Sequence, residues 1–277
     1  MSASVVEHPS EAIYAEGMQI EAPHPESSRA RTWAEIVIVL ALSLGASALY
    51  SLVSFIDKAT RETALSEQAS ELNRTLAERP AFDLTYQLLG IVLGLAPVAL
   101  VIFLTWQRQK PHLAGLGITE LKPSSLLRDA GGGVALAAAV GIPGIGLYVI
   151  ARILGLNTQV VASSLAEHWY TVPVLVLAAL NAALLEEFIV VAYLFNRLHK
   201  LGWRPWSIIV FSAVLRASYH LYQGVGGFVG NLAMGILFAW VYKRWGRLLP
   251  LVIAHWMLDI ASFVGYAWIA SVWPEIF

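Results

Sequence analysis

Apolar residues in this chain come in long uninterrupted blocks, and these blocks limit the folds that are open to it. Each block is about 20 residues long, the length that a helix needs to cross a hydrocarbon core of roughly 30 Å. Hydrophobic residues make up 57% of the 277 residues and charged residues only 13%, against about 25% charged in soluble domains. The sequence therefore predicts an all-α, polytopic integral membrane bundle and excludes soluble folds.

Seven transmembrane helices are expected from these blocks. They cover residues 34–55, 82–106, 130–154, 172–197, 205–222, 225–243 and 248–271. Because Lys and Arg mark cytoplasmic connections, their distribution predicts the orientation. The second, fourth and sixth connections hold Arg108, Lys110, Lys122, Arg128, Arg197, Lys200, Arg204, Lys243, Arg244 and Arg247. This pattern predicts a cytoplasmic N-terminus.

Two segments outside the spans carry expectations of their own. Residues 1–33 are polar and contain no basic segment followed by a short apolar core, so we expect a disordered cytoplasmic tail without a cleavable signal peptide. The connection 57–80 departs from the charge pattern, because it is predicted to be external yet holds four basic residues. Leu65, Ala69, Leu72 and Leu76 recur there at helical spacing. The spacing indicates an amphipathic helix on the membrane or packed against the bundle.

Charge and cysteine content exclude several classes of function. The net charge is −1, which gives no reason to expect a nucleic-acid partner. The chain has no cysteine, so disulfides, cysteine nucleophiles and thiolate metal sites are ruled out. The partners expected from composition are therefore membrane lipids and membrane-associated molecules.

Two adjacent carboxylates, Glu186 and Glu187, stand inside the fourth predicted span. An ionised carboxylate at the bilayer centre costs about 2.5–3.5 kcal/mol on insertion scales, so such residues face a polar interior or water. Adjacent helix positions differ by about 100°, which predicts that the two cannot both point at one small target. One glutamate is then the working group and the other a support; a hydrogen-bonded pair that joins helices is the alternative.

Two more spans present polar residues at a spacing of four. Arg216 with His220, and His255 with Asp259, each share a helix face. A lone histidine in a membrane is more often a satisfied hydrogen-bond donor than a catalyst. Convergence of three helices with Glu, His, His and Asp favours a site instead. Asn231 in the sixth span is polar too, and either lines the same cavity or joins helices.

These residues carry a resemblance to a known family. Glu186-Glu187, then a helix with His220, then His255-xxx-Asp259 resembles the CPBP family, which unites CAAX prenyl endopeptidases with bacterial Abi-type proteins. The family pattern is Glu-Glu-xxx-Arg, then Phe-xxx-His, then His-xxx-Asn or Asp. The resemblance implies a CPBP intramembrane peptidase domain over residues 113–271, preceded at 34–112 by N-terminal transmembrane helices with an amphipathic loop.

The sequence departs from the family pattern at two positions. Val191 stands where the family has its arginine, and Arg216 stands four residues before His220 where the family has phenylalanine. We expect Arg216 to pair with a glutamate of the fourth span, because a charge at membrane depth needs a partner. The alternative is that the altered motif marks a member without catalysis.

The resemblance implies hydrolysis of a peptide bond in a water-accessible cavity within the membrane. Such hydrolysis needs a base for water, a proton donor for the leaving amine and stabilisation of the oxyanion. By analogy with the family, Glu186 activates the water and His220 helps to hold it. His255 and Asp259 then lie on the oxyanion side, and Glu187 orients the cluster.

Metal dependence stays open at this point. Glu186, His220 and His255 could ligate Zn²⁺ with an open position for water, as in a metalloprotease. The chain has no His-Glu-xx-His run, and the family is also described as working through glutamate without a metal. We expect no cofactor, with Zn²⁺ as the alternative.

The expected function is thus an intramembrane endopeptidase acting on a membrane-associated peptide or protein. One rival is a non-enzymatic CPBP-type protein in bacteriocin immunity or scaffolding, which Val191 favours. The other is a proton-coupled transporter, against which the lack of internal repeats argues. The Ala-rich, lysine-poor composition fits a high-GC bacterium, so the expected location is a bacterial plasma membrane.

Overall fold

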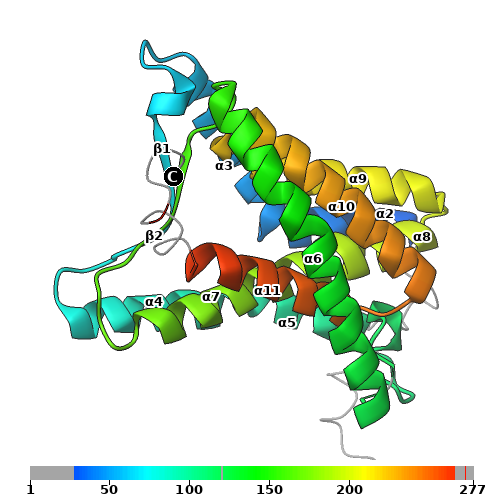
Figure 1. Ribbon diagram of the computed structural model, residues 1–277. Helices are drawn as coiled ribbons and strands as arrows, with labels where there is room; N and C mark the ends of the chain where they lie inside the picture. Colours follow the sequence, from blue (N-terminus) through cyan, green and yellow to red (C-terminus); the bar gives the residue numbers. More distant parts are fainter. Residues whose placement is uncertain (1–27, 120, 266–271, 273–277) are drawn as a thin grey trace, which may run out of the picture.

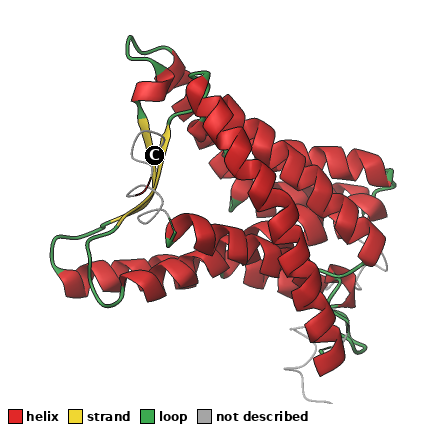
Figure 2. Cartoon of the chain, in the orientation of Figure 1, coloured by secondary structure: helices red, strands yellow, loops and turns green. Residues whose placement is uncertain are grey.

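Helices make up most of the chain (Figures 1 and 2). The computed structural model describes residues 28–119, 121–265 and 272. The α-helices are α2 (Arg29–Ala41), α3 (Leu44–Ala59), α4 (Pro80–Gly94), α5 (Ala96–Thr105), α6 (Pro123–Ile153), α7 (Thr171–Glu186), α8 (Leu194–Lys200), α9 (Pro205–Tyr219), α10 (Val225–Trp245) and α11 (Leu249–Phe263). A π-helix, η3 (Glu187–Tyr193), joins α7 to α8, and single 3₁₀ turns are η1 (Leu65–Glu67), η2 (Ala114–Leu116) and η4 (Leu221–Gln223).

Several helices have the length and apolarity of membrane spans. Within the described residues, four qualify: Pro80–Thr105, Pro123–Ile153, Thr171–Lys200 and Val225–Trp245. A fifth is added if α2 and α3, which meet at 53°, form one broken span. α9 and α11 have 15 residues each, and the predicted end of the last span at 271 lies outside the described residues. The chain is a polytopic helical membrane protein, but the predicted number of seven spans is not confirmed.

Apolar side chains on the outside of the bundle support this assignment. The span Pro80–Thr105 has a mean hydropathy of 2.7, yet only 17% of its most apolar window is buried inside the protein. Its exposed side chains include Leu89, Val92, Leu93 and Phe103. Since large exposed apolar surfaces are rare on soluble monomers, these residues face lipid.

The N-terminal boundary of the first helix differs from the predicted one. The helix α2 begins at Arg29 rather than at 34, because the side chain of Ser28 accepts a hydrogen bond from the backbone N–H of Arg31 at 3.2 Å and caps the helix. Residues 29–33 therefore do not belong to the predicted tail. The rest of that tail, residues 1–27, lies outside the described residues.

The amphipathic helix predicted within 57–80 is wrong. The segment forms the turn η1 and a strand, β1 (Ala69–Arg74), which pairs in parallel with β2 (Gln159–Ser164), with Ala69 opposite Gln159. Buried polar groups hold this strand in place: the hydroxyl of Ser70 lies 2.8 Å from that of Thr158. Pairing with a strand 90 positions away in the sequence therefore determines the conformation of this segment, and the helical spacing of its leucines does not.

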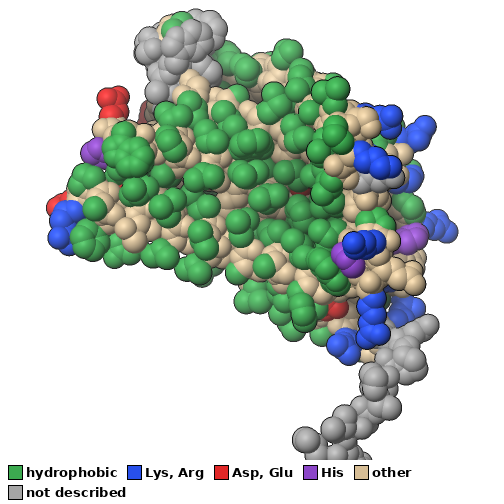
Figure 3. Space-filling model, turned by 90° about the horizontal axis from the view of Figure 1, so that it is seen from below, with side chains coloured by type: hydrophobic (Ala, Val, Ile, Leu, Met, Phe, Trp, Pro, Cys, Tyr) green, Lys and Arg blue, Asp and Glu red, His purple; other side chains and the backbone are tan. Residues whose placement is uncertain are grey.

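The two ends of the bundle carry different residues. At one end, Arg29 donates to the carbonyl of Leu201 and the N–H of Leu248 donates to the carbonyl of Gly117, both at 3.2 Å. The side chain of Asn196 donates to the carbonyl of Gly115 at 3.0 Å, so the start of α2 and the three basic connections lie together. Figure 3 shows most of the visible Lys and Arg side chains at one end of an apolar surface. The β1–β2 sheet lies at the opposite end, where α7 begins (Figure 1).

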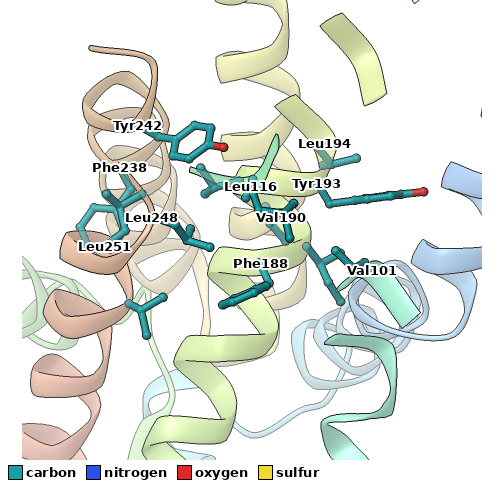
Figure 4. Packing of buried hydrophobic residues seen from close by; sticks show 14 of the residues in the cluster. Val101, Leu116, Phe188, Val190, Tyr193, Leu194, Phe238, Tyr242, Leu248 and Leu251 are labelled. Carbon is teal, nitrogen blue, oxygen red and sulfur yellow. The ribbon is translucent and has the colours of Figure 1, made fainter. Parts of the chain in front are cut away.

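The π-helix η3 lies at the centre of the core. All seven of its residues are buried, and Figure 4 shows Phe188 and Val190 among side chains of several other helices. A π-turn changes the carbonyl pairing of the chain around it, and the hydroxyl of Ser212 on α9 donates to the carbonyl of Val190 at 2.5 Å. This contact fixes α9 against the segment that carries the two glutamates.

A largely buried ion pair connects α8 to α2 and gives a stability prediction. Arg197 donates to Glu35 at 2.6 Å and to the carbonyl of Leu104 at 2.7 Å. We expect Arg197→Leu to lower the free energy of unfolding by about 3 kcal/mol, because Glu35 loses its partner in a poorly solvated place. Denaturant titration in detergent micelles measures this loss. Arg61→Ala, which removes the exposed contact of Arg61 with Asp57, should cost under about 1 kcal/mol; equal losses for both variants would contradict the prediction.

Candidate active site

The two glutamates stand at the junction of α7 and η3 and differ in exposure. Glu186 is 8% exposed and lines a large cavity, whereas Glu187 is fully buried and is not part of the cavity wall. Solvent or a substrate can therefore reach Glu186 from the cavity. Glu187 is accessible only to neighbouring side chains.

Arg216 of α9 lies between the two carboxylates. Its Nη2 contacts Oε1 of Glu187 at 2.6 Å, and its Nη1 lies 3.7 Å from Oε2 of Glu186. The guanidinium is fully buried and packs over the ring of Phe238, with 5.5 Å from Cζ to the ring centre. The predicted pairing of Arg216 with a glutamate of the fourth span is confirmed. The structure also shows why it is needed, because an unpaired buried cation would be very unfavourable.

His255 of α11 meets the same pair of carboxylates. Its Nδ1 lies 2.7 Å from Oε1 of Glu187, and its Nε2 lies 3.9 Å from Oε2 of Glu186. The same Nε2 is 3.5 Å from Oδ2 of Asp259, one turn further along α11. The predicted common face of His255 and Asp259 is therefore observed, and it points toward Glu186.

The expectation that adjacent glutamates cannot reach one target is wrong. Both carboxylates lie within 4 Å of Arg216 and of His255. A regular α-helix would separate the two side chains by about 100°, but the wider π-turn begins at Glu187, and glutamate side chains are long enough to converge. The two residues nevertheless differ as expected in one respect, since one faces the cavity and the other is buried.

His220 follows the last residue of α9 and lines the cavity. Its Nδ1 lies 3.0 Å from the backbone carbonyl of Arg216, which fixes the ring. Arg216 and His220 were predicted to share a helix face, but only His220 belongs to the cavity wall. The physical reason is that α9 ends at Tyr219, so His220 already has the geometry of a helix cap.

Tyr219 belongs to the cluster although sequence reasoning missed it. Its hydroxyl donates to Oε2 of Glu186 at 2.7 Å, and its ring centre is 4.8 Å from that of His220. A tyrosine within an apolar span needs a hydrogen-bond partner, so its position next to His220 was the available signal. The choice of Glu186 as that partner depends on how α9 packs against α7.

The cavity that Glu186 faces has a volume of about 980 Å³. His220, His255 and Asp259 line it together with Asn231 of α10. Asn231 was left open between cavity wall and contact between helices. It lines the cavity, and its amide donates within its own helix, to the carbonyl of Gly227 at 3.0 Å.

The residues named as possible zinc ligands do not fit that role. Among the described residues, no group of three or more His, Asp and Glu side chains is arranged to hold a metal ion. Arg216 already places a positive charge 3.7 Å from Glu186, and it would repel a divalent cation bound to that carboxylate.

Comparison with known proteins gives a family match, and it covers the segment that contains this cluster. No curated protein and no solved structure matches the chain. A family model described as type II CAAX prenyl endopeptidase Rce1-like matches residues 168–261. That segment contains both glutamates, Arg216, both histidines and Asp259. The resemblance of the motifs is thus confirmed: residues 168–261 match the Rce1-like type II CAAX prenyl endopeptidase family.

Proposed function

We propose that the protein is an intramembrane endopeptidase of the CPBP type, which hydrolyses a peptide bond of a membrane-associated peptide or protein. The main support is that Glu186 faces a cavity of about 980 Å³ in a membrane protein while its carboxylate is held by Tyr219. A carboxylate that is oriented by a hydrogen bond and lies at the wall of a cavity can act as a general base that activates water. The match of residues 168–261 to a peptidase family supports the same class of reaction.

In the proposed reaction, Glu186 takes a proton from water as the water oxygen attacks the scissile carbonyl. His220, at the cavity wall, helps to hold that water. His255 and Asp259 lie on the oxyanion side: the imidazole of His255 stabilises the oxyanion, and the carboxyl group of Asp259, 3.5 Å from Nε2, orients that imidazole. Collapse of the tetrahedral intermediate breaks the C–N bond, and Glu186 returns the proton to the leaving amine.

Glu187 and Arg216 are positioning residues in this proposal. Glu187 receives Arg216 and His255 on the same oxygen, Oε1, so it holds the imidazole and the guanidinium in one arrangement. Arg216 supplies the cation that the family carries at the position of Val191. In this proposal the cation is on α9 instead of on the helix segment of Val191, and its carboxylate partner is Glu187.

We assign the peptidase domain to residues 113–271 and the N-terminal helices to the segment before it, which begins at Arg29 rather than at the expected residue 34. The cytoplasmic side is assigned to the end where the basic connections meet the start of α2, because basic residues are retained there. The β1–β2 sheet then faces outward. A bacterial plasma membrane is the proposed location, on the basis of composition.

The role of Glu186 gives the first test. Glu186→Gln should abolish proteolysis, with a loss of at least about 100-fold, because the amide cannot accept the proton of water. New peptide termini in membranes of cells that express wild type or variant are compared by mass spectrometry. Glu78→Gln, which changes an exposed carboxylate, is the matched control. If wild type and Glu186→Gln give identical termini while a biological phenotype persists, the non-enzymatic alternative holds.

The pairing of Arg216 with Glu187 gives a second test. Arg216→Leu should lower the free energy of unfolding by about 3–5 kcal/mol, because Glu187 stays buried without its cation. The double variant Arg216→Leu/Glu187→Leu should lose less than the sum of the single variants, with a coupling of about 1–3 kcal/mol. Chemical unfolding in detergent measures all four proteins. Additive losses would show that the two side chains do not depend on each other.

The metal content of the active protein gives a third test. Purified wild type that cleaves its substrate should contain far less than one zinc per chain by inductively coupled plasma mass spectrometry. Activity should persist in 1,10-phenanthroline, because the proposed base is a carboxylate and not a metal-bound hydroxide. One zinc per active chain, lost together with activity on chelation, would overturn the metal-free mechanism.

A further inference from the structure

The β1–β2 sheet contributes to the wall of the cavity that contains Glu186. Leu72 and Asn73 of β1 and Val160 of β2 line it, as does Tyr148 of α6. These residues come from a part of the molecule remote in sequence from the glutamates. The cavity thus places strand backbone and the proposed base in one continuous space, which is large enough for a peptide segment.

Within the described residues, no strand pairs with the outer edge of β2, whose backbone groups contact only side chains: Tyr148 at the N–H of Val160 and Asn73 at the carbonyl of Ala162. Within the described chain the sheet has two strands, so each has only one strand neighbour. Gln159 donates its N–H to the carbonyl of Gln68 on the β1 side. Because successive residues of a strand point their N–H groups to opposite sides, the N–H of Val160 points away from β1. This N–H donates to the hydroxyl of Tyr148 at 3.3 Å, which is long for a hydrogen bond. The carbonyl of an added strand could replace the hydroxyl as the acceptor.

A peptidase that acts within a membrane needs groups that pair with the backbone of its substrate, and the edge of a strand provides them. A membrane peptide is helical, because lipid offers no partners for its backbone groups. Cleavage requires that the helix unwinds near the scissile bond, and each unpaired backbone group then costs several kcal/mol unless the enzyme pairs it. The edge of a sheet pairs an extended chain through its backbone, whatever the side chains are.

Asn181 provides a polar group between the start of α7 and Glu186. The cavity-lining residues of α7 are Ala178, Asn181, Ala182, Leu185 and Glu186, the spacing of one helix face. The side-chain oxygen Oδ1 of Asn181 is buried without a hydrogen-bond partner in the described structure. Buried amides are normally paired. The carboxamide packs beside Gly94 of α4, so it would pair with a substrate after a rotation of the side chain towards the cavity.

The spacing along α7 fits an extended substrate. Asn181 precedes Glu186 by five residues, or about 7.5 Å along the helix. An extended chain rises about 3.3 Å per residue, so Asn181 lies about two residues from the bond at Glu186. A carboxamide offers one acceptor and two N–H groups, which match the N–H and C=O of a peptide unit.

We propose that the substrate binds as an extended strand that adds to the outer edge of β2 at Val160, with the carboxamide of Asn181 pairing a peptide unit about two residues from the scissile bond. The enzyme then recognises an unwound segment of a membrane peptide through its backbone. This inference rests on the proposed peptidase function and specifies how its substrate is held.

Proline at the strand edge tests the backbone contact. Val160→Pro removes the outward N–H and leaves the bonds between β1 and β2 in place, whereas Val160→Ala keeps the N–H and loses only side-chain volume. We expect Val160→Pro to reduce the Glu186-dependent termini at least 10-fold relative to Val160→Ala. Asn181→Leu, similar in size but unable to pair, should reduce them as well. Equal cleavage by Val160→Pro and Val160→Ala would overturn the proposal.

Cross-linking tests the extended conformation without relying on cleavage or on the proline variant. The chain has no cysteine, so Val160→Cys in the Glu186→Gln protein carries a single thiol. The probe is a synthetic copy of a membrane peptide whose termini depend on Glu186, with one cysteine moved along it residue by residue.

The cross-linking pattern separates the possible results. Disulfide yield should alternate with a period of two, as for a neighbouring strand. A period of three to four would mean a helical bound peptide, and absence of cross-links would mean binding elsewhere; either result overturns the inference. Absence of any Glu186-dependent peptide in the first place would refute the peptidase function itself, so the two failures are distinguishable.

Discussion

The structure around the cavity depends on the burial of one arginine against a glutamate. Arg216 and Glu187 have no exposed surface, and in that environment neither charge could remain without the other. His255 approaches the same oxygen of Glu187 that Arg216 contacts. A single carboxylate therefore joins η3, α9 and α11. Glu186 directly precedes η3, His220 directly follows α9, and His255 lies on α11, so this contact holds in place the elements that position these three cavity residues.

The local helix geometry separates the two neighbouring carboxylates into different environments. The α-helix ends at Glu186 and the π-helix begins at Glu187, and the carbonyl of Val190 within it is satisfied by Ser212. Irregular turns of this kind are often found at functional sites. Here the turn keeps Glu187 among buried partners and leaves Glu186, bonded to Tyr219, at the cavity surface. Two identical side chains can thereby serve different purposes.

The small sheet gives the bundle a feature that a purely helical protein would lack. Peptide bonds in a membrane are protected by helical pairing, so a hydrolase must open the helix and then satisfy the freed groups. Residues of the sheet and Asn181, whose Oδ1 has no hydrogen-bond partner in the described structure, line the same cavity as the proposed base. Chemistry would then belong to the helical cluster within the matched family segment, and substrate binding would depend in part on the β1–β2 sheet, which lies outside that segment.

The sequence by itself determined the membrane character, the positions of the main helices and the polar cluster, because apolar blocks and charges within them are local patterns with few physical explanations. It also indicated that Arg216 needs a glutamate. The tertiary structure decided which carboxylate pairs with Arg216, how Tyr219 contacts Glu186, and that residues 69–74 form a strand. These features could not be predicted, because they arise from contacts between residues far apart in the chain: Ser70 meets Thr158, and Tyr219 meets Glu186. The spacing of apolar and polar residues indicates the local conformation of a segment, whereas tertiary packing determines which distant residues it contacts.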